Sequence, residues 1–459
     1  MQPAAPATES TITPEIVANT SLRLDTIRLR NFRAFTDFKL QLHPNLTVLV
    51  ATNGCGKTAV LDGVAASLGT FAGVFDDTTG KQFRREDVRK TRTDDGLGAM
   101  EFQYPLETEC AGSIGGRTVK WSRALAGDTA KTTTAKASVL RQYAENLQQM
   151  VRVVSEQGGR PGVLPFLSYY GTGRLWSEKR LTTRKESKQG TSRFAGYIDC
   201  LDSASSYKMF ADWFERMSRA EYDARDIPDE LELVRTQLAV VREAVDTALA
   251  PSRWRSITFK NSTDGIVVEH PERGTLPVEW LSDGIRSIVG LVADIAYRCV
   301  RLNAHLGVDA ARSTPGILLI DEIDMHLHPT WQQVIVGALR TTFPSLQMIV
   351  TTHSPQVLTT VRRECVRILR GDEAFLPSQS TYGAPSGRVL SDEMRTEQRP
   401  PGNPVTENME RLFRMISEDD LEGAEALHGR MSAEMGPDES LVEADMMIRN
   451  ARWAIGSDL

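Results

Sequence analysis

The stretch of sequence that decides the fold is Ala51-Thr52-Asn53-Gly54-Cys55-Gly56-Lys57-Thr58. It follows a short apolar run at 46–50 and precedes a helical pattern of apolar residues at 60–68. Successive backbone N–H groups at the N-terminus of such a helix bind anionic oxygens. The strand–loop–helix pattern therefore predicts a phosphate-binding loop.

Two side chains of this loop have distinct expected roles with ATP and Mg²⁺. Lys57 is expected to reach the β- and γ-phosphates, and the hydroxyl of Thr58 to bind Mg²⁺. The loop departs from the pattern G-x-x-x-x-G-K-[ST] at its first position, where Ala51 replaces glycine. The predicted nucleotide contacts in this loop are Asn53, Gly54, Cys55, Gly56, Lys57 and Thr58.

A pair of carboxylates follows the apolar run Ile317–Ile320, which is typical of a central parallel strand. Asp321 is expected to bind Mg²⁺, and Glu322 to orient and deprotonate the attacking water. The alternative is an acidic strand end that caps the next helix. His353 ends the following apolar run, where it is expected to contact the γ-phosphate or the water.

A second anion site is predicted at Ser282 and Gly284, which precede a mostly apolar helix. The alternative is an ordinary N-capping serine. One chain does not readily bring two such helix ends to the same nucleotide. We therefore expect a second protomer to supply Ser282 and Gly284.

The composition is that of a globular protein of 459 residues with a net charge of −6, so it predicts no global affinity for nucleic acid. Five scattered cysteines show no metal-ligand spacing and fit the reducing cytoplasm. The most apolar stretch, near 288–300, contains Asp294 and Arg298 and is too short to span a bilayer. We expect a cytoplasmic protein with no membrane contact.

The sequence predicts a nucleotide-binding head with appendages. A helical insertion broken at Pro228 has arms of about 30 Å each, at 1.5 Å per residue. It lacks the sustained heptads of a long coiled-coil ATPase. The predicted divisions are a tail (1–20), a first head lobe (21–194), the helical insertion (195–251), a second head lobe (252–370), a linker (371–404) and a C-terminal helical hairpin (405–459).

Together these motifs make the chain similar to the ABC-type ATPase heads of the RecF, Rad50 and OLD-like group over roughly 21–370. The resemblance implies an α/β head with a mixed sheet and a β-subdomain, in a head-to-tail homodimer that sandwiches two ATP molecules. Ser282 and Gly284 match the signature motif of that group. Its Q-loop glutamine has two candidates here, Gln82 and the segment 169–174. A transporter subunit is disfavoured, since 281–287 lacks the usual glutamine.

A narrower resemblance, to the ATPase subunits of Septu-type and retron-associated anti-phage systems, rests on 31–35, 169–176, 324–332 and the C-terminal helices. It implies regulation of a separately encoded HNH-type nuclease. The alternative is a RecF-like DNA repair accessory. His326 and His328 are interpreted as the D-loop region, because no third metal ligand of suitable spacing follows.

Two basic stretches, 81–93 and 174–193, are either solvated loops or contacts to nucleic-acid phosphates.

Overall fold

The computed structural model describes residues 21–76, 78–92, 99–174, 192–203, 208–263, 265–397 and 399–457. The chain forms two compact units, which divide between Val389 and Leu390. The first unit contains every residue predicted to bind nucleotide. Its mixture of sheets and helices has the predicted α/β architecture.

The central sheet has six strands in the order β15-β14-β3-β13-β12-β8. All adjacent pairs are parallel except β14 and β15. Ile320 pairs with Val350, and Thr352 pairs with Val50, so the carboxyl ends of three strands meet at one edge. The strands are β3 (Leu46–Val50), β8 (Phe166–Tyr170), β12 (Gly316–Ile320), β13 (Leu346–Thr352), β14 (Val366–Arg370) and β15 (Glu373–Phe375).

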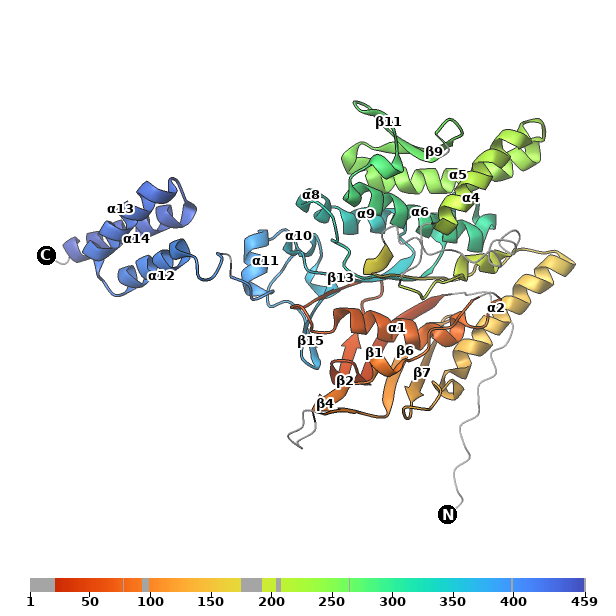
Figure 1. Cartoon of the computed structure of the whole chain (residues 1–459), viewed down its shortest axis with the longest axis horizontal. Helices are drawn as coiled ribbons and strands as arrows, with labels where there is room; N and C mark the ends of the chain where they lie inside the picture. The colour runs from red at the N-terminus through yellow and green to blue at the C-terminus, as the bar shows by residue number, and fades with distance from the viewer. Residues whose placement is uncertain are drawn as a thin grey trace, which may run out of the picture. The chain divides into compact units, whose positions relative to one another are not determined.

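A second, antiparallel sheet has the order β2-β1-β6-β7. Gly115 and Gly116 form its β6–β7 turn with positive φ angles of 56° and 80°, a conformation that favours glycine. Helix α1 (Lys57–Ala72) is buried along most of its length because it packs against both sheets (Figure 1). The strands are β1 (Leu22–Phe32), β2 (Phe35–Gln41), β6 (Leu106–Ile114) and β7 (Arg117–Leu125).

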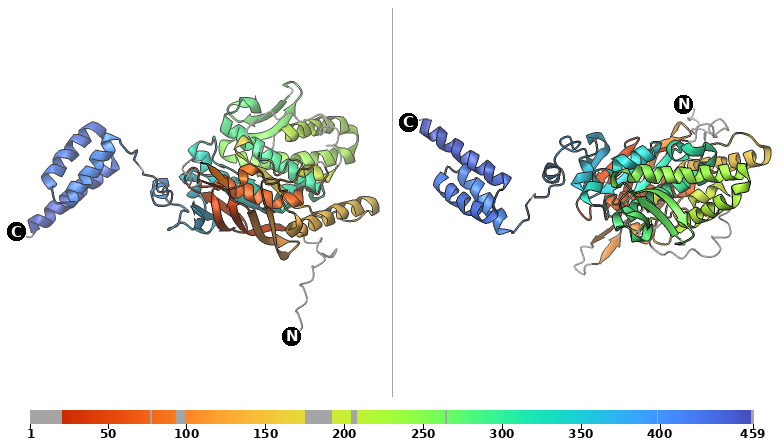
Figure 2. Two further views of the ribbon diagram at one scale, coloured as in Figure 1. Left: turned by 60° about the horizontal axis from the view of Figure 1, so that its bottom comes forward. Right: turned by 90° about the horizontal axis from the view of Figure 1, so that it is seen from above.

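Helices cover the other side of the central sheet (Figures 1 and 2). The insertion forms two of them, and the second begins at Pro228, where the sequence predicts a break. It packs against the helix that follows Ser282. The layer comprises α4 (Lys208–Asp223), α5 (Pro228–Leu249), α6 (Asp283–Asn303) and α9 (Ile335–Thr342).

Further elements complete the first unit. Helix α2 (Ser138–Gln157) packs on α1, and a three-stranded sheet precedes α6. The remaining strands are β4 (Lys90–Arg92), β5 (Met100–Phe102), β9 (Arg255–Lys260), β10 (Gly265–His270) and β11 (Gly274–Pro277). The remaining helices are α7 (Ala310–Ser313), α8 (Pro329–Gln332), α10 (Pro355–Leu358) and α11 (Ser386–Asp392).

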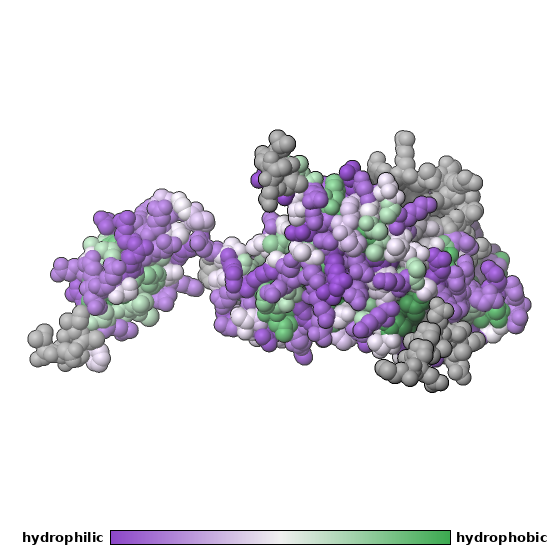
Figure 3. Space-filling model, turned by 90° about the horizontal axis from the view of Figure 1, so that it is seen from below, coloured by the Kyte–Doolittle hydropathy of each residue, from purple (hydrophilic) through white to green (hydrophobic). Residues whose placement is uncertain are grey.

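The segment expected as a linker, 371–404, contains β15 and α11. A strand of three residues is too short to give a periodic signal, so its sequence reads as loop. The C-terminal segment forms three helices with a shared apolar core, rather than a hairpin. They are α12 (Pro404–Ser417), α13 (Leu421–Met435) and α14 (Glu439–Ser457). Figure 3 shows hydrophobic areas on the mostly hydrophilic surface of this unit.

Candidate nucleotide-binding site

The loop between β3 and α1 needs glycine at two positions. Gly54 and Gly56 have φ angles of 81° and 87°, in the left-handed region that favours glycine. A Cβ atom on Gly56 would also lie 2.5 Å from the ring of Phe35, which is buried in the β1–β2 region. Ala51 does not have a positive φ angle, so the backbone at this position does not require the glycine of the usual pattern.

Lys57 is held inside this loop. Its side chain is 7% exposed, and Nζ donates a hydrogen bond to the carbonyl oxygen of Ala51 at 3.0 Å. Burial lowers the pKa of Lys57, while Asp321 and Glu322 oppose that shift. A buried cation with one backbone acceptor is suited to binding an anion, since phosphate oxygens would supply the opposite charge.

Thr58 and Asp321 lie together although 263 positions separate them. The Thr58 hydroxyl donates to Oδ2 of Asp321 at 2.8 Å, and the Thr351 hydroxyl donates to Oδ1 at 2.6 Å. A carboxylate and a hydroxyl at the end of a phosphate-binding loop form an oxygen pair that fits Mg²⁺. Thr351 therefore orients the carboxylate, a role that the sequence pattern did not identify.

Glu322 has an unusual backbone conformation. Its φ angle is 48°, which is uncommon for a residue with a long side chain. The backbone N–H of Glu322 donates to the Thr351 hydroxyl at 2.7 Å, so Thr351 contacts both the Asp321 carboxylate and the Glu322 backbone. Strained backbone of this kind costs about 1–3 kcal/mol and clusters at functional sites.

His353 follows β13 at the same edge of the sheet. Its backbone N–H donates to Oδ1 of Asp324 at 3.3 Å, and the Thr352 hydroxyl donates to the same oxygen at 2.5 Å. Ser354 donates to Oε1 of Gln332 at 2.7 Å. These bonds link the segment after β13 to the segment 321–332.

Ser282 and Gly284 line a cavity of about 510 Å³, and Lys57, Thr58 and Asp321 are not among its lining residues. The Ser282 side chain is exposed and makes no capping hydrogen bond to α6. A Cβ atom on Gly284 would lie 2.7 Å from the carbonyl oxygen of His326, so this position requires a residue without a side chain. The residues that line the cavity are Ser282, Asp283, Gly284, Ile285, His326, His328, Thr330 and Trp331.

The structure therefore brings together Lys57, Thr58 and Asp321 but places Ser282 and Gly284 in a separate cavity of the same chain. His326 and His328 also line the Ser282 cavity. Within the described ranges, no cluster of three or more His, Cys, Asp or Glu side chains could hold a metal ion.

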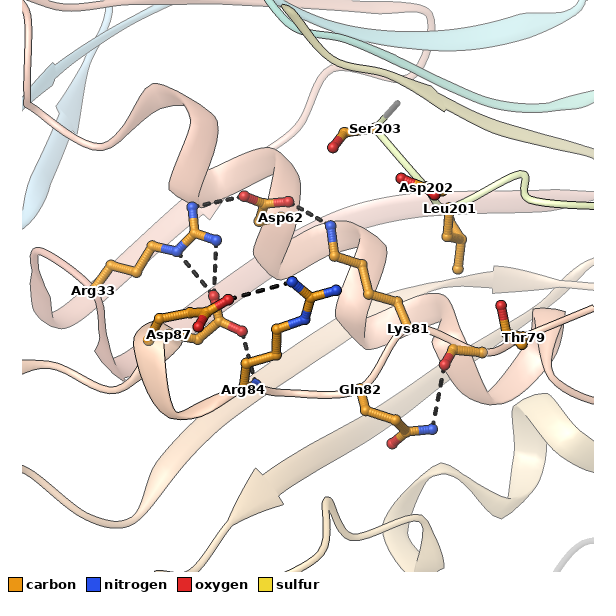
Figure 4. Close-up of a pocket in the computed structure, with 12 residues that line it drawn as sticks. Arg33, Asp62, Thr79, Lys81, Gln82, Arg84, Asp87, Leu201, Asp202 and Ser203 are labelled. Carbon is orange, nitrogen blue, oxygen red and sulfur yellow. Dashed lines mark hydrogen bonds and ion pairs between the residues drawn. The ribbon is translucent and has the colours of Figure 1, made fainter. Parts of the chain in front are cut away.

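Another cavity, of about 490 Å³, lies beside α1 (Figure 4). The arginine and lysine side chains that line this cavity form ion pairs with carboxylates that also line it. Arg33 contacts Asp62 and Asp87 at 2.6 and 2.8 Å, and Lys81 also pairs with Asp62. Burial opposes the charge of Arg33, but the two carboxylates outweigh burial and raise its pKa. Arg33 and Lys81 in this cavity are therefore already paired with carboxylates of the same chain.

The two Q-loop candidates have different surroundings. Oε1 of Gln82 accepts a 2.6 Å hydrogen bond from Arg123, a side chain buried in the first unit. Tyr170 instead lies beside the carboxylate pair, since its carbonyl oxygen accepts from the Asp321 N–H at 2.8 Å. The position of Tyr170 beside Asp321 favours the segment 169–174 as the Q-loop. The Q-loop role of this segment stays a prediction.

A buried polar chain connects the Asp321 backbone to α6. The Tyr170 hydroxyl donates to Oδ2 of Asp294 at 2.6 Å, and Nε of Arg298 donates to the same oxygen at 2.8 Å. Asp294 and Arg298 lie on α6, the helix that begins beside Ser282. Burial and Asp294 raise the pKa of the Tyr170 hydroxyl, so it remains a hydrogen-bond donor.

The basic stretches give limited support for nucleic-acid binding. Three cations of the first stretch, Lys81, Arg84 and Arg85, form ion pairs with Asp62, Glu86 and Asp128. The second stretch, 174–193, lies mostly outside the described residues. As for membranes, no helix in the described part of the chain is both long and apolar enough to cross one.

The strand–loop–helix unit, with Asp321 and Glu322 at the end of β12, a parallel strand of the same sheet, has the arrangement of a P-loop nucleotide-binding site. A family model described as "AAA domain" matches 26–239. A second model, described as "AAA domain, putative AbiEii toxin, Type IV TA system", matches 173–359.

Relatives carry the names of the two systems that the motifs predict. "Retron Ec83 probable ATPase" of Escherichia coli is 26% identical over 497 residues, covering 94% of this chain and 88% of the relative. "Septu protein PtuA" of Bacillus thuringiensis is 22% identical over 339 residues, covering 72% of each. A solved SMC head bound to the C-winged helix domain of ScpA aligns with a TM-score of 0.47 and 13% identity, covering 78% and 98% of the two chains. The predicted relationship to retron and Septu ATPases is confirmed by the first two.

Proposed function

We propose that this chain binds and slowly hydrolyses ATP, dimerises around it, and thereby regulates a separately encoded HNH-type nuclease in anti-phage defence. The observation that carries the ATPase proposal is the contact between Thr58 and Asp321, which places two Mg²⁺-type ligands beside buried Lys57. The relatives named for retron and Septu systems support the cellular role.

In the proposed reaction, Lys57 and the backbone N–H groups at the start of α1 hold the phosphates. Thr58 and Asp321 would hold Mg²⁺, which would neutralise charge on the phosphate oxygens when bound. Glu322 orients and deprotonates the attacking water, and His353 contacts the γ-phosphate or that water.

Dimerisation is supported by the separation of the two anion sites. The exposed Ser282 hydroxyl is not used to cap α6, and the Ser282 cavity does not include Lys57 or Thr58 among its lining residues. In a head-to-tail pair, the Ser282 of one protomer would complete the phosphate site of the other.

The proposal is tested by affinity purification of the chain expressed with its flanking genes, followed by mass spectrometry of proteins and nucleic acids that co-purify. We expect a stoichiometric HNH-type nuclease. Recovery of the chain with DNA alone would instead favour a RecF-like repair accessory and contradict the proposed role.

A further inference from the structure

We propose that α14 presents a docking surface for a basic polypeptide, and that this polypeptide is the nuclease subunit. The identity of the partner rests on the proposed function. The location of the surface rests on features of the C-terminal unit alone.

Helix α14 has two apolar sides. One packs into the core of the C-terminal unit, and the other is exposed. Leu441, Ala444 and Ile448 face the core that the three C-terminal helices share, and each is at most 3% exposed. A second set, Val442, Met446 and Trp453, is 53, 59 and 76% exposed. We call this second set the α14 stripe.

The spacing of the α14 stripe places its members along one side of the helix. Met446 follows Val442 by four residues and precedes Trp453 by seven, which correspond to about one and two helical turns. At about 100° per residue, the α14 stripe faces away from the side of the helix that packs into the core. An exposed tryptophan aligned with methionine and valine is typical of a binding anchor, because aromatic residues dominate interface energetics.

The charge of the unit indicates which partner the stripe fits. Residues 390–459 contain 16 Asp or Glu against 7 Lys or Arg, a net charge of −9. Residues 1–389 therefore carry 44 acidic and 47 basic side chains, which nearly balance. The acidity of the whole chain is thus concentrated in the C-terminal unit.

The net charge of the C-terminal unit distinguishes between the partners that could bind the α14 stripe. Nucleic acid is repelled by a unit of net charge −9, and so is the same unit of a second copy. The chain's own head lacks a matching positive excess. A basic chain is attracted, and a nuclease that binds a polyanion is expected to be basic.

The test measures the dissociation constant of the full-length chain for the purified nuclease encoded beside it. Trp453→Ala and Met446→Ala are compared with Met447→Ala, a matched control. Met447 is also exposed, at 41%, but lies about 100° around the helix from Met446. ATP hydrolysis by each variant verifies that the head is intact.

We expect Trp453→Ala to weaken nuclease binding about thirtyfold, as for an interface hot spot, with a smaller loss for Met446→Ala and none for Met447→Ala. Wild-type binding should also weaken as salt rises. Wild-type affinity in Trp453→Ala would overturn the docking surface while leaving the proposed function intact. A wild-type chain that binds no nuclease would overturn both. Loss of nuclease binding after nucleic-acid digestion would also overturn the inference. So would a substitution in the α14 stripe that changes only self-association or packing on the head.

Discussion

The buried ion pair between Asp294 and Arg298 allows a quantitative test of the link between β8 and α6. Both side chains are nearly inaccessible, at 2% and 0% exposure, and their charged atoms are 2.8 Å apart. Replacing Arg298 with methionine keeps much of the side-chain volume but removes the positive charge. The carboxylate of Asp294 would then be buried with the Tyr170 hydroxyl as its remaining donor.

The expected cost follows from that uncompensated charge. Breaking a buried pair by removing one partner destabilises a protein by about 3–5 kcal/mol. Arg298 also donates to the carbonyl oxygens of Gly196 and Ile198, at 3.0 Å each, and these acceptors would lose their donor. We therefore expect Arg298→Met to lower the free energy of unfolding of the head unit by about 4 kcal/mol.

Urea denaturation followed by tryptophan fluorescence measures this loss. Trp213 is a suitable reporter, because it is buried in α4 with its ring centroid 5.1 Å from that of Tyr297, the neighbour of Arg298 on α6. The matched control is the double variant Asp294→Asn/Arg298→Met, which removes both charges and leaves an amide oxygen for Tyr170. It should recover about 1–2 kcal/mol of the loss. A loss below about 1 kcal/mol in Arg298→Met, or no recovery in the double variant, would refute the reasoning.

Three further predictions concern the nucleotide site. Thr58→Val should reduce Mg²⁺-dependent ATP turnover by about 100-fold or more, which corresponds to at least about 2.7 kcal/mol in the activation free energy. Phosphate release measures this loss. Unchanged turnover would contradict the role of Thr58 as a Mg²⁺ ligand. Cys55 should be the cysteine that iodoacetamide labels in the folded protein, and ATP should slow its labelling, because the other four cysteines are buried and burial raises the pKa of each thiol. Mass spectrometry checks this, and equal labelling of a buried cysteine would contradict it. Gly284→Ala should weaken ATP-induced dimerisation about tenfold without changing the affinity of the isolated protomer for ATP, because the new methyl group would lie 2.7 Å from a backbone oxygen of His326. Light scattering measures the dimer, and a wild-type dimer would refute that steric argument.

The parts that sequence predicts well are those that depend on local chemistry. The strand–loop–helix unit at 46–72, the strand before the acidic pair at 321–322 and the break at Pro228 each depend on residues that are adjacent in the chain. Backbone N–H geometry and glycine conformation specify such elements without reference to distant residues. The α/β class follows, because strands that are buried on both sides have continuous apolar sequences.

The parts that sequence did not predict depend on contacts between distant positions. Thr351 binds Asp321 only because β13 lies beside β12, an adjacency that no local pattern specifies. Similarly, the positive charge of 81–92 is partly neutralised by carboxylates such as Asp62 and Asp128, which lie elsewhere in the chain. The left-handed backbone of Glu322 runs against local preference, so propensity gives no indication of it.

The measurement that tests the central claim most directly is ATP binding and turnover by Lys57→Ala and Glu322→Gln beside the wild type. The account predicts that Lys57→Ala does not bind ATP. It predicts that Glu322→Gln binds ATP, does not hydrolyse it, and accumulates as a dimer. Hydrolysis at the wild-type rate by both variants would contradict the assignment of this site.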